Sequence, residues 1–330
     1  MRLTHTSGKT KRRGAWRALS VLVLVLALAP SLASAQANSG ALDLLFPIGA
    51  RATGMGTAFV AEQGSESVWW NPAGLSRMTK PEFALDHFQN IQIKGDAISF
   101  ILPVRPVGVF AISARLFDYG SIEERDTTNT PGGEFPNRTW VLGASFAADF
   151  GSSFDAGVTY HLYRGEAGLT PAFGTSALDI GAQYRPSSTV PLRIGFGVRN
   201  LGLSLQVHDK AQSDELPTRL HLGVSYDPTF AQFPKELTAR VTGEVVSDMS
   251  GENGELRLGS QLGYASGPSR VFLRAGYVKQ QGEGYALLAG PSLGLGLTSG
   301  RVQLDIARIF ESFSSGLGAQ PTYISVRIGL

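Results

Sequence analysis

Residues 40–78 read G-A-L-D-L-L-F-P-I-G-A-R-A-T-G-M-G-T-A-F-V-A-E-Q-G-S-E-S-V-W-W-N-P-A-G-L-S-R-M. This segment precedes every clear strand pattern in the chain and is too short to form a domain by itself. Gly49, Gly54 and Gly56 lack a Cβ, so the backbone there can adopt positive φ angles or approach another segment closely. The sequence therefore predicts a compact plug that sits inside the mouth of a barrel.

The second half of this segment carries a helix and a turn signal. Ser65 is predicted to cap a helical turn over 66–70, and the turn ends at Asn71 because Pro72 disfavours helical geometry in the residue before it. Asn71 to Gly74 then fits a type I turn, with Asn first, Pro second and Gly fourth. The two tryptophans before the turn suit stacking on a ligand, but we favour packing of the plug against the barrel wall.

The motif G-A-R-A-T-G-M-G-T-A-F-V-A at 49–61, followed by W-W-N-P-A-G-L at 69–75, resembles the N-terminal signature of the PorV/PorQ family of outer-membrane proteins. That family is similar in turn to FadL-type fatty-acid channels, which carry an Asn-Pro-Ala element behind an N-terminal hatch. The resemblance implies an outer-membrane barrel with a plug. The plug and signature residues are Gly49, Arg51, Gly54, Met55, Gly56, Trp70, Asn71, Pro72 and Gly74.

The first 35 residues have the pattern of an export signal. A basic stretch without acidic residues is followed by an apolar run over 18–29 and by the small-residue site Ala33-Ser34-Ala35. This pattern predicts export by the general secretory route and cleavage after Ala35. The expected organisation is a signal peptide at 1–35, a plug at 36–80 and a transmembrane β-barrel at 81–330.

Composition excludes several classes of protein. The predicted mature chain has 23 basic and 27 acidic residues, a formal net charge of −4, so nothing favours binding to nucleic acid. The chain has no cysteine, so an exported fold must be closed by hydrogen bonds and packing instead of disulfides. Forty glycines and frequent short apolar alternation favour an all-β chain.

Fourteen candidate strands follow residue 80, and several alternate cleanly between apolar and polar side chains. Their connections tend to alternate between short and long, with long ones at 117–138, 164–174 and 201–216. Outer-membrane barrels show this asymmetry, with tight periplasmic turns and long outer loops. The strands are expected at 82–90, 95–102, 107–116, 139–149, 154–163, 175–185, 190–200, 217–226, 236–246, 255–265, 270–279, 284–297, 301–310 and 321–330.

The unpaired edges of an open sheet favour closure into a barrel. An open sheet of this size would expose two unpaired edges, whereas a closed barrel satisfies every backbone group, as lipid requires. We therefore predict a closed antiparallel transmembrane β-barrel of about fourteen strands, in the outer membrane, with lipid at its apolar outer face. Aromatic residues near strand ends are predicted to form interfacial girdles: Trp140, Tyr160, Tyr226, Tyr264, Tyr277 and Tyr323.

Outward apolar faces place many charged side chains in the lumen. These charges either line a polar channel or grip the plug, or they pair across neighbouring strands and fill the interior; we favour pairing. The main lumen-facing candidates are Arg193, Arg199, His221, Arg240, Glu244, Arg274 and Asp305.

No catalytic, metal or cofactor site is predicted. The five histidines lack metal-ligand spacing, and no serine has the context of a nucleophile elbow. Gly54-Met55-Gly56 lacks the strand, helix and third glycine of a dinucleotide turn. An enzyme is therefore the least supported class.

Three functions remain. The resemblance to PorV implies a partner or shuttle for proteins secreted by a type IX-like machine. The first alternative is a FadL-like channel for hydrophobic small molecules, and the second is a structural barrel without transport. Function is carried by sites and not by folds, so these three stay open on the sequence.

Overall fold

The computed structural model describes residues 40–330 except residues 90–92, 126–127, 169, 187–189, 207–212, 230–233, 250–252, 282–288 and 311–319. The predicted signal peptide at 1–35 and the first plug residues, 36–39, lie outside the described residues. No helix in the described part of the chain is long and apolar enough to cross a membrane.

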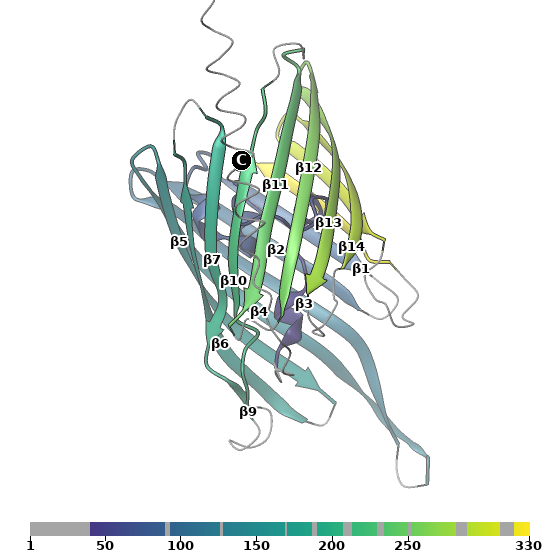
Figure 1. Cartoon of the computed structure of the whole chain (residues 1–330). Helices are drawn as coiled ribbons and strands as arrows, with labels where there is room; N and C mark the ends of the chain where they lie inside the picture. Colours follow the sequence, from purple (N-terminus) through teal and green to yellow (C-terminus); the bar gives the residue numbers. More distant parts are fainter. Residues whose placement is uncertain are drawn as a thin grey trace, which may run out of the picture.

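Fourteen strands form a closed antiparallel barrel, which confirms the predicted fold class (Figure 1). Barrel neighbours follow each other in the sequence, and β1 closes the ring on β16, with Glu82 opposite Gly329. The connection between β7 and β10 carries the small two-stranded sheet of β8 and β9. The strands are β1 Glu82–Gln89, β2 Lys94–Val104, β3 Gly108–Arg125, β4 Pro131–Phe150, β5 Phe154–Ala167, β6 Thr170–Tyr184, β7 Leu192–Gly202, β8 Leu205–Gln206, β9 Ser213–Asp214, β10 Arg219–Tyr226, β11 Leu237–Asp248, β12 Gly254–Ser266, β13 Ser269–Gln281, β14 Gly290–Ser299, β15 Val302–Ile309 and β16 Thr322–Gly329.

The apolar faces of the strands look outward, as period-two alternation requires. Phe196, Leu304 and Ile324 are each about half exposed, with exposed fractions of 46%, 48% and 45%. The alternate positions are buried against the interior. Since outer-membrane barrels present an apolar band to lipid, this distribution suits a barrel that spans an outer membrane.

The two ends of the barrel differ. One end, here called the turn end, has tight connections such as 151–153 between β4 and β5 and 267–268 between β12 and β13. The other, the loop end, carries the connections after β1, β3, β5, β7, β11, β13 and β15. In outer-membrane barrels the tight turns lie at the periplasmic end and the longer loops at the outer end.

Two of the long loops that we predicted are mostly strand. β3 runs to Arg125 and β4 starts at Pro131, so the predicted loop at 117–138 is a long hairpin. Likewise β5 runs to Ala167 and β6 starts at Thr170. Backbone pairing continues beyond the membrane, where both faces of a hairpin can be polar, and apolar alternation therefore gave no sign of these extensions.

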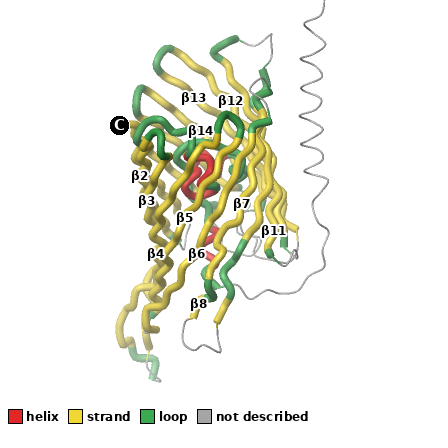
Figure 2. The backbone as a smooth tube through the Cα atoms, turned by 90° about the vertical axis from the view of Figure 1, so that its left-hand side faces the viewer, coloured by secondary structure: helices red, strands yellow, loops and turns green. Residues whose placement is uncertain are grey.

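Four short helices lie in the segment before the barrel, and Figure 2 shows helices in red inside the ring of strands. They are the 3-10 helices η1 (Leu42–Leu45) and η2 (Pro72–Leu75), and the α-helices α2 (Ala50–Gly54) and α3 (Ser67–Trp70). Ser65 does not cap the helical turn as predicted. Glu66 holds the N-cap position of α3 and makes no side-chain capping bond there, because its carboxylate contacts α2 instead.

Tyr323 does not belong to the outer aromatic girdle as predicted. It is 2% exposed and stacks inside the barrel on Phe88, with ring centroids 5.5 Å apart. Tyr323 shares its alternation with Ser325 and Arg327, whose side chains are also buried. Whether Tyr323 points inward or outward is therefore decided by the alternation of side chains along β16, and not by its position near the end of the strand.

Candidate functional site

The plug, residues 40–78, runs through the barrel from the loop end to the turn end. At the loop end Asp43 of η1 is buried and accepts hydrogen bonds from the hydroxyl groups of Thr139 and Tyr163. At the turn end Arg77 binds Asp155, with Nε and Oδ1 2.8 Å apart. The chain then enters β1, so the plug is fixed to the wall at both ends.

Gly49 allows the first turn of α2 to receive a carboxylate. The Glu66 side chain accepts hydrogen bonds from the backbone N–H groups of Ala52, at 2.8 Å, and Arg51, at 3.2 Å. Gly49 has φ of +94°, and a Cβ there would lie 2.5 Å from the Glu66 carboxyl carbon. Arg327 of β16 holds the same carboxylate at 2.9 Å, which links the helix to the wall.

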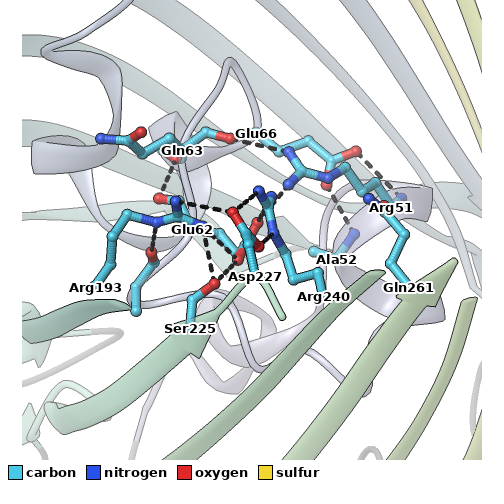
Figure 3. Close-up of polar contacts among 12 residues, drawn as sticks. Arg51, Ala52, Glu62, Gln63, Glu66, Arg193, Ser225, Asp227, Arg240 and Gln261 are labelled. Carbon is cyan, nitrogen blue, oxygen red and sulfur yellow. Dashed lines mark hydrogen bonds and ion pairs between the residues drawn. The ribbon is translucent and has the colours of Figure 1, made fainter. Parts of the chain in front are cut away.

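Glu62 is the centre of a network of ion pairs that joins the plug to the wall (Figure 3). Its carboxylate pairs with Arg51 of the plug. It also pairs with two arginines of the barrel wall, Arg240 at 2.7 Å and Arg193 at 3.4 Å. Ser225 donates a further hydrogen bond at 2.6 Å. We call this group of five side chains the Glu62 latch.

The charges of the latch stabilise one another. Burial acts to raise the pKa of the Glu62 carboxyl, but the three guanidinium groups outweigh it and hold that pKa at about 2. Burial in turn lowers the pKa of Arg51 to about 10, still far above neutral pH. At neutral pH the latch is therefore a fully ionised, largely buried network, and removing Glu62 would leave three guanidinium groups without the carboxylate they share.

A second carboxylate binds the plug backbone. Glu244 of β11 accepts hydrogen bonds from the N–H groups of Phe59, at 2.7 Å, and Val60, at 2.8 Å. The His221 Nδ1 atom lies 2.7 Å from the other carboxylate oxygen. Arg257 Nη1 donates to the Thr57 carbonyl at 3.3 Å. Main-chain groups of the plug that have no helix or sheet partner thus find partners on the wall.

The wall has a row of inward glycines that makes room for the plug. A Cβ at Gly54 would lie 3.0 Å from the Gly294 Cα atom, and one at Gly56 would lie 2.7 Å from the Tyr277 nitrogen. On the wall, a Cβ at Gly223 would lie 2.7 Å from a methyl group of Val60. We call the wall residues in close contact with the plug the glycine seat: Gly157, Gly181, Gly195, Gly223, Gly259, Gly276 and Gly294.

The Asn-Pro-Ala-Gly corner connects the plug to two further strands. Asn71 Oδ1 accepts from the Ala73 N–H at 3.1 Å and so caps η2, with Pro72 in the first turn. Its Nδ2 donates to Val60 at 2.6 Å and to the carbonyls of Ala182 and Phe196 at 3.3 Å each. The predicted turn is therefore a 3-10 helix that is bonded to β6 and β7.

Three other signature residues are buried within the plug. Trp70 is 4% exposed, its indole N–H donates to the Ile48 carbonyl at 3.0 Å, and the Arg199 guanidinium lies 5.2 Å from its ring centre. Gly74 packs closely against Ser67, because a Cβ added at Gly74 would lie 2.8 Å from the Cβ atom of Ser67. Met55 is fully buried. These contacts assign packing roles to the signature.

The structure places all seven predicted lumen residues on the inner face. Arg193, Arg240 and Glu244 bond the plug directly, and His221 supports Glu244. The other three pair with wall residues: Arg199 lies 3.8 Å from Asp179, and Arg274 is 2.6 Å from Asp305. Pairing across strands, which we favoured, is thus combined with gripping of the plug.

Sequence reasoning missed Glu62 and Glu66, although their carboxylates bind three arginines of the wall. The signal was present, because they are the only acidic residues between 44 and 78 and are four residues apart. The glycine seat was also missed. Its members share the alternation of inward residues, as Gly195 does with Arg193 and Gly223 with His221, and a run of inward glycines indicates close approach by another backbone.

The inner face changes character toward the loop end. Phe88, Phe117 and Tyr323 point inward there. Phe88 and Phe117 meet Phe46 of the plug, and Tyr323 stacks on Phe88, with ring centroids 5.5–5.7 Å apart in each pair. We call these four side chains the aromatic layer. Barrel interiors are ordinarily polar, so this aromatic patch on the inner faces of β1, β3 and β16 differs from the charged inner faces of other strands, such as the Arg219–Asp248 pair of β10 and β11. Within the described residues, no group of acidic, histidine or cysteine side chains is suited to a metal.

No protein-family model and no curated protein matches the chain. The fold is similar to solved outer-membrane barrels. A TodX monoaromatic hydrocarbon channel with a deltaS2S3 mutation is 14% identical, with a TM-score of 0.50 over 85% of this chain and 97% of that one. The CymD monoaromatic hydrocarbon channel is 13% identical, with a TM-score of 0.50 over 86% and 96%.

A FadL homologue from Pseudomonas aeruginosa is 9% identical, with a TM-score of 0.47 over 86% of this chain and 98% of that one. These neighbours share the barrel fold of this chain. At these identities the likeness concerns the fold, and the site must be judged on its own residues.

Proposed function

We propose that this protein is an outer-membrane channel for apolar small molecules, and that the plug holds it closed in the present structure. The aromatic layer carries the proposal. An apolar solute that enters from the loop end along β1, β3 and β16 meets inward aromatic rings before it reaches the Glu62 latch. Burial of apolar surface against such rings favours binding by about 25 cal/mol per Å².

Phe46 has a particular place in this proposal. It belongs to the plug, yet it packs on Phe88 and Phe117 of the wall. It therefore occupies the position that an apolar solute would take between these rings. Passage requires the plug to shift, because the plug, held by the latch and seated on the wall glycines, fills the lumen below this layer.

The fold likeness agrees with this class of function. TodX and CymD are monoaromatic hydrocarbon channels, and both resemble this chain over most of their length. We therefore choose toluene as the first solute to test.

The role in protein secretion that the resemblance to PorV implies is less well supported. Its signature residues, such as Gly54, Met55 and Pro72, are buried between plug and wall. Buried side chains cannot form a docking surface for a secreted protein unless the plug leaves the barrel. The signature is accounted for by the seating of the plug.

Accumulation of radiolabelled toluene by cells that have no other hydrocarbon channel tests the proposal. Cells that express the wild type should accumulate toluene faster than cells with an empty vector. Phe117→Asn places an amide among the rings, and burying a polar group without a partner costs about 1–3 kcal/mol. Uptake should therefore fall toward the level of the empty vector.

Phe150→Asn is the matched control, because Phe150 is 61% exposed at the turn end and lies outside the aromatic layer. It should leave uptake unchanged. Heat modifiability on a gel checks that both variants form barrels. Equal uptake by wild type and empty vector would contradict a channel and favour a structural barrel, and equal loss in both variants would remove the aromatic layer from the path.

A further inference from the structure

A hollow of about 530 Å³ opens at the turn end, between the plug and strands β11 to β15. Its lining is unusually basic. Five arginines reach it, and the only carboxylate among its described lining residues is Asp227. The charged lining residues are Arg51, Arg77, Arg240, Arg270, Arg274 and Asp227.

Asp227 shows how this hollow holds a carboxylate. Its two oxygens accept hydrogen bonds from Arg240, with Nε at 2.5 Å and Nη2 at 2.8 Å. Arg193 approaches the same carboxylate at 3.5 Å. The first pair has the planar, two-point geometry in which a guanidinium recognises a carboxylate or a phosphate. A built anion site is therefore present, and a residue of the chain fills it.

Asp227 is placed so that it can be exchanged. Its side chain is 31% exposed, whereas Glu62, the other partner of Arg240, is fully buried. An anion from solvent thus competes with Asp227 and leaves Glu62 in place. The Asp227–Arg240 pair is half-buried, with the carboxylate on the side that solvent reaches, so a ligand replaces one carboxylate–guanidinium pair by another of the same kind.

Arg270 adds a charge that no described carboxylate neutralises. It lies at the start of β13 on the rim of the hollow and is exposed. The described residues show no ion pair for it, in contrast to Arg240 and Arg274. Positive charge that focuses into a concave site raises the local concentration of anions.

We propose that this hollow binds a small anion with carboxylate or phosphate groups from the periplasmic side, with Arg240 as the two-point ligand and Arg270 as the rim charge. Asp227 occupies the site in the absence of the anion. The ligand comes either from solution or from the headgroup of an anionic phospholipid, since both present the same phosphate chemistry. This site goes beyond the proposed channel, because it lies at the opposite end from the aromatic layer.

Isothermal titration calorimetry of the full chain in neutral detergent, with inorganic phosphate as the probe, tests the site. Asp227→Asn removes the competing carboxylate and should tighten binding about tenfold, while Arg270→Ala should weaken it about fivefold, as expected for charges near an anion. Arg301→Ala is the control. Arg301 is an exposed arginine at the same end, between β14 and β15, that does not line the hollow.

A second titration uses nanodiscs of phosphatidylcholine with or without phosphatidylglycerol. If the heat of phosphate binding disappears only in discs that contain phosphatidylglycerol, the lipid headgroup occupies the site, and this result supports the proposal. Heat modifiability shows that each variant is folded. Phosphate binding that is equal in the wild type and in Arg270→Ala, or no binding even by the Asp227→Asn variant, would overturn the proposal. Toluene uptake plays no part in these measurements, so the channel and the anion site can fail separately.

Discussion

At the residue scale, Gly49 and Glu66 show why the signature motif needs particular residues at particular positions. Freedom of the backbone at Gly49 was predictable, because glycine is the residue that tolerates positive φ. The partner was not. Glu66 lies on another turn of the plug, and only the fold brings its carboxylate to the N-terminal N–H groups of α2. Local signals give conformation, whereas the contacts that fix it are non-local.

Gly49→Ala should destabilise the protein more than a positive φ alone explains. Alanine at a left-handed position costs about 1–2 kcal/mol, and here its Cβ would also collide with the Glu66 carboxyl group. Gly120→Ala is the matched control, with φ of +84° and no atom within 4 Å of the added Cβ. Thermal unfolding of the two purified variants measures the difference. Similar losses in both would mean that the contact with Glu66 adds nothing.

Glu62 should make stability depend on pH in the acid range. Its pKa is about 2 in the folded protein, against 4.5 for an ordinary glutamate, so ionisation favours the folded state. This contribution, at most about 3 kcal/mol, is complete above about pH 4.5 and is lost as the pH falls through 2. Glu62→Gln should therefore be less stable than the wild type at pH 7 and nearly equal to it at pH 2.

Unfolding curves of the wild type and Glu62→Gln between pH 2 and pH 7 measure this effect. Glu123→Gln is a control at an exposed glutamate on the β3–β4 hairpin. A constant difference between wild type and Glu62→Gln across the pH range would contradict the ionised latch.

At the scale of elements, the strands were largely predictable and the plug contacts were not. Alternation in segments such as 217–226 reports which face meets lipid, because an apolar solvent selects apolar side chains at every second position. It is silent where both faces meet water, as in the outer part of β3 and β4. It is equally silent about which inward residues meet the plug, and the glycine seat emerged only from the structure.

The Asn71-Pro72 corner should be a separable part of the plug. Asn71→Ala with Pro72→Ala removes the bonds from Asn71 to Val60, Ala182 and Phe196. The barrel strands begin at Glu82, so we expect the barrel to fold and the segment from Arg51 to Trp70 to become sensitive to protease. Limited proteolysis of the reconstituted variant beside the wild type measures this.

Two results of that proteolysis would contradict the expectation. Equal protection of the segment in both proteins would show that the corner does not hold the plug. Loss of the whole barrel, seen as loss of heat modifiability, would show that the plug belongs to the folding core.

At the scale of the whole molecule, the chain is a closed barrel whose interior is occupied by a plug that both ion pairs and glycine contacts hold in place. The inner faces of β1, β3 and β16 are aromatic toward the loop end, whereas most of the remaining inner face is polar or charged. The closed, plugged fold could be predicted from the sequence, because closure follows from backbone pairing in lipid. The position of the aromatic layer could not, since it depends on which inward residues of different strands lie at the same level of the barrel.

The central claim is that a polar latch keeps the plug in the lumen and so closes a channel. Ion conductance of the purified protein in planar lipid bilayers tests it most directly, with Glu62→Ala combined with Glu244→Ala as the variant. Both carboxylates bond the plug to the wall. We predict that the wild type stays closed and that the double variant conducts in discrete, long openings. A wild type that conducts steadily, or a folded double variant that stays as closed as the wild type, would contradict the account.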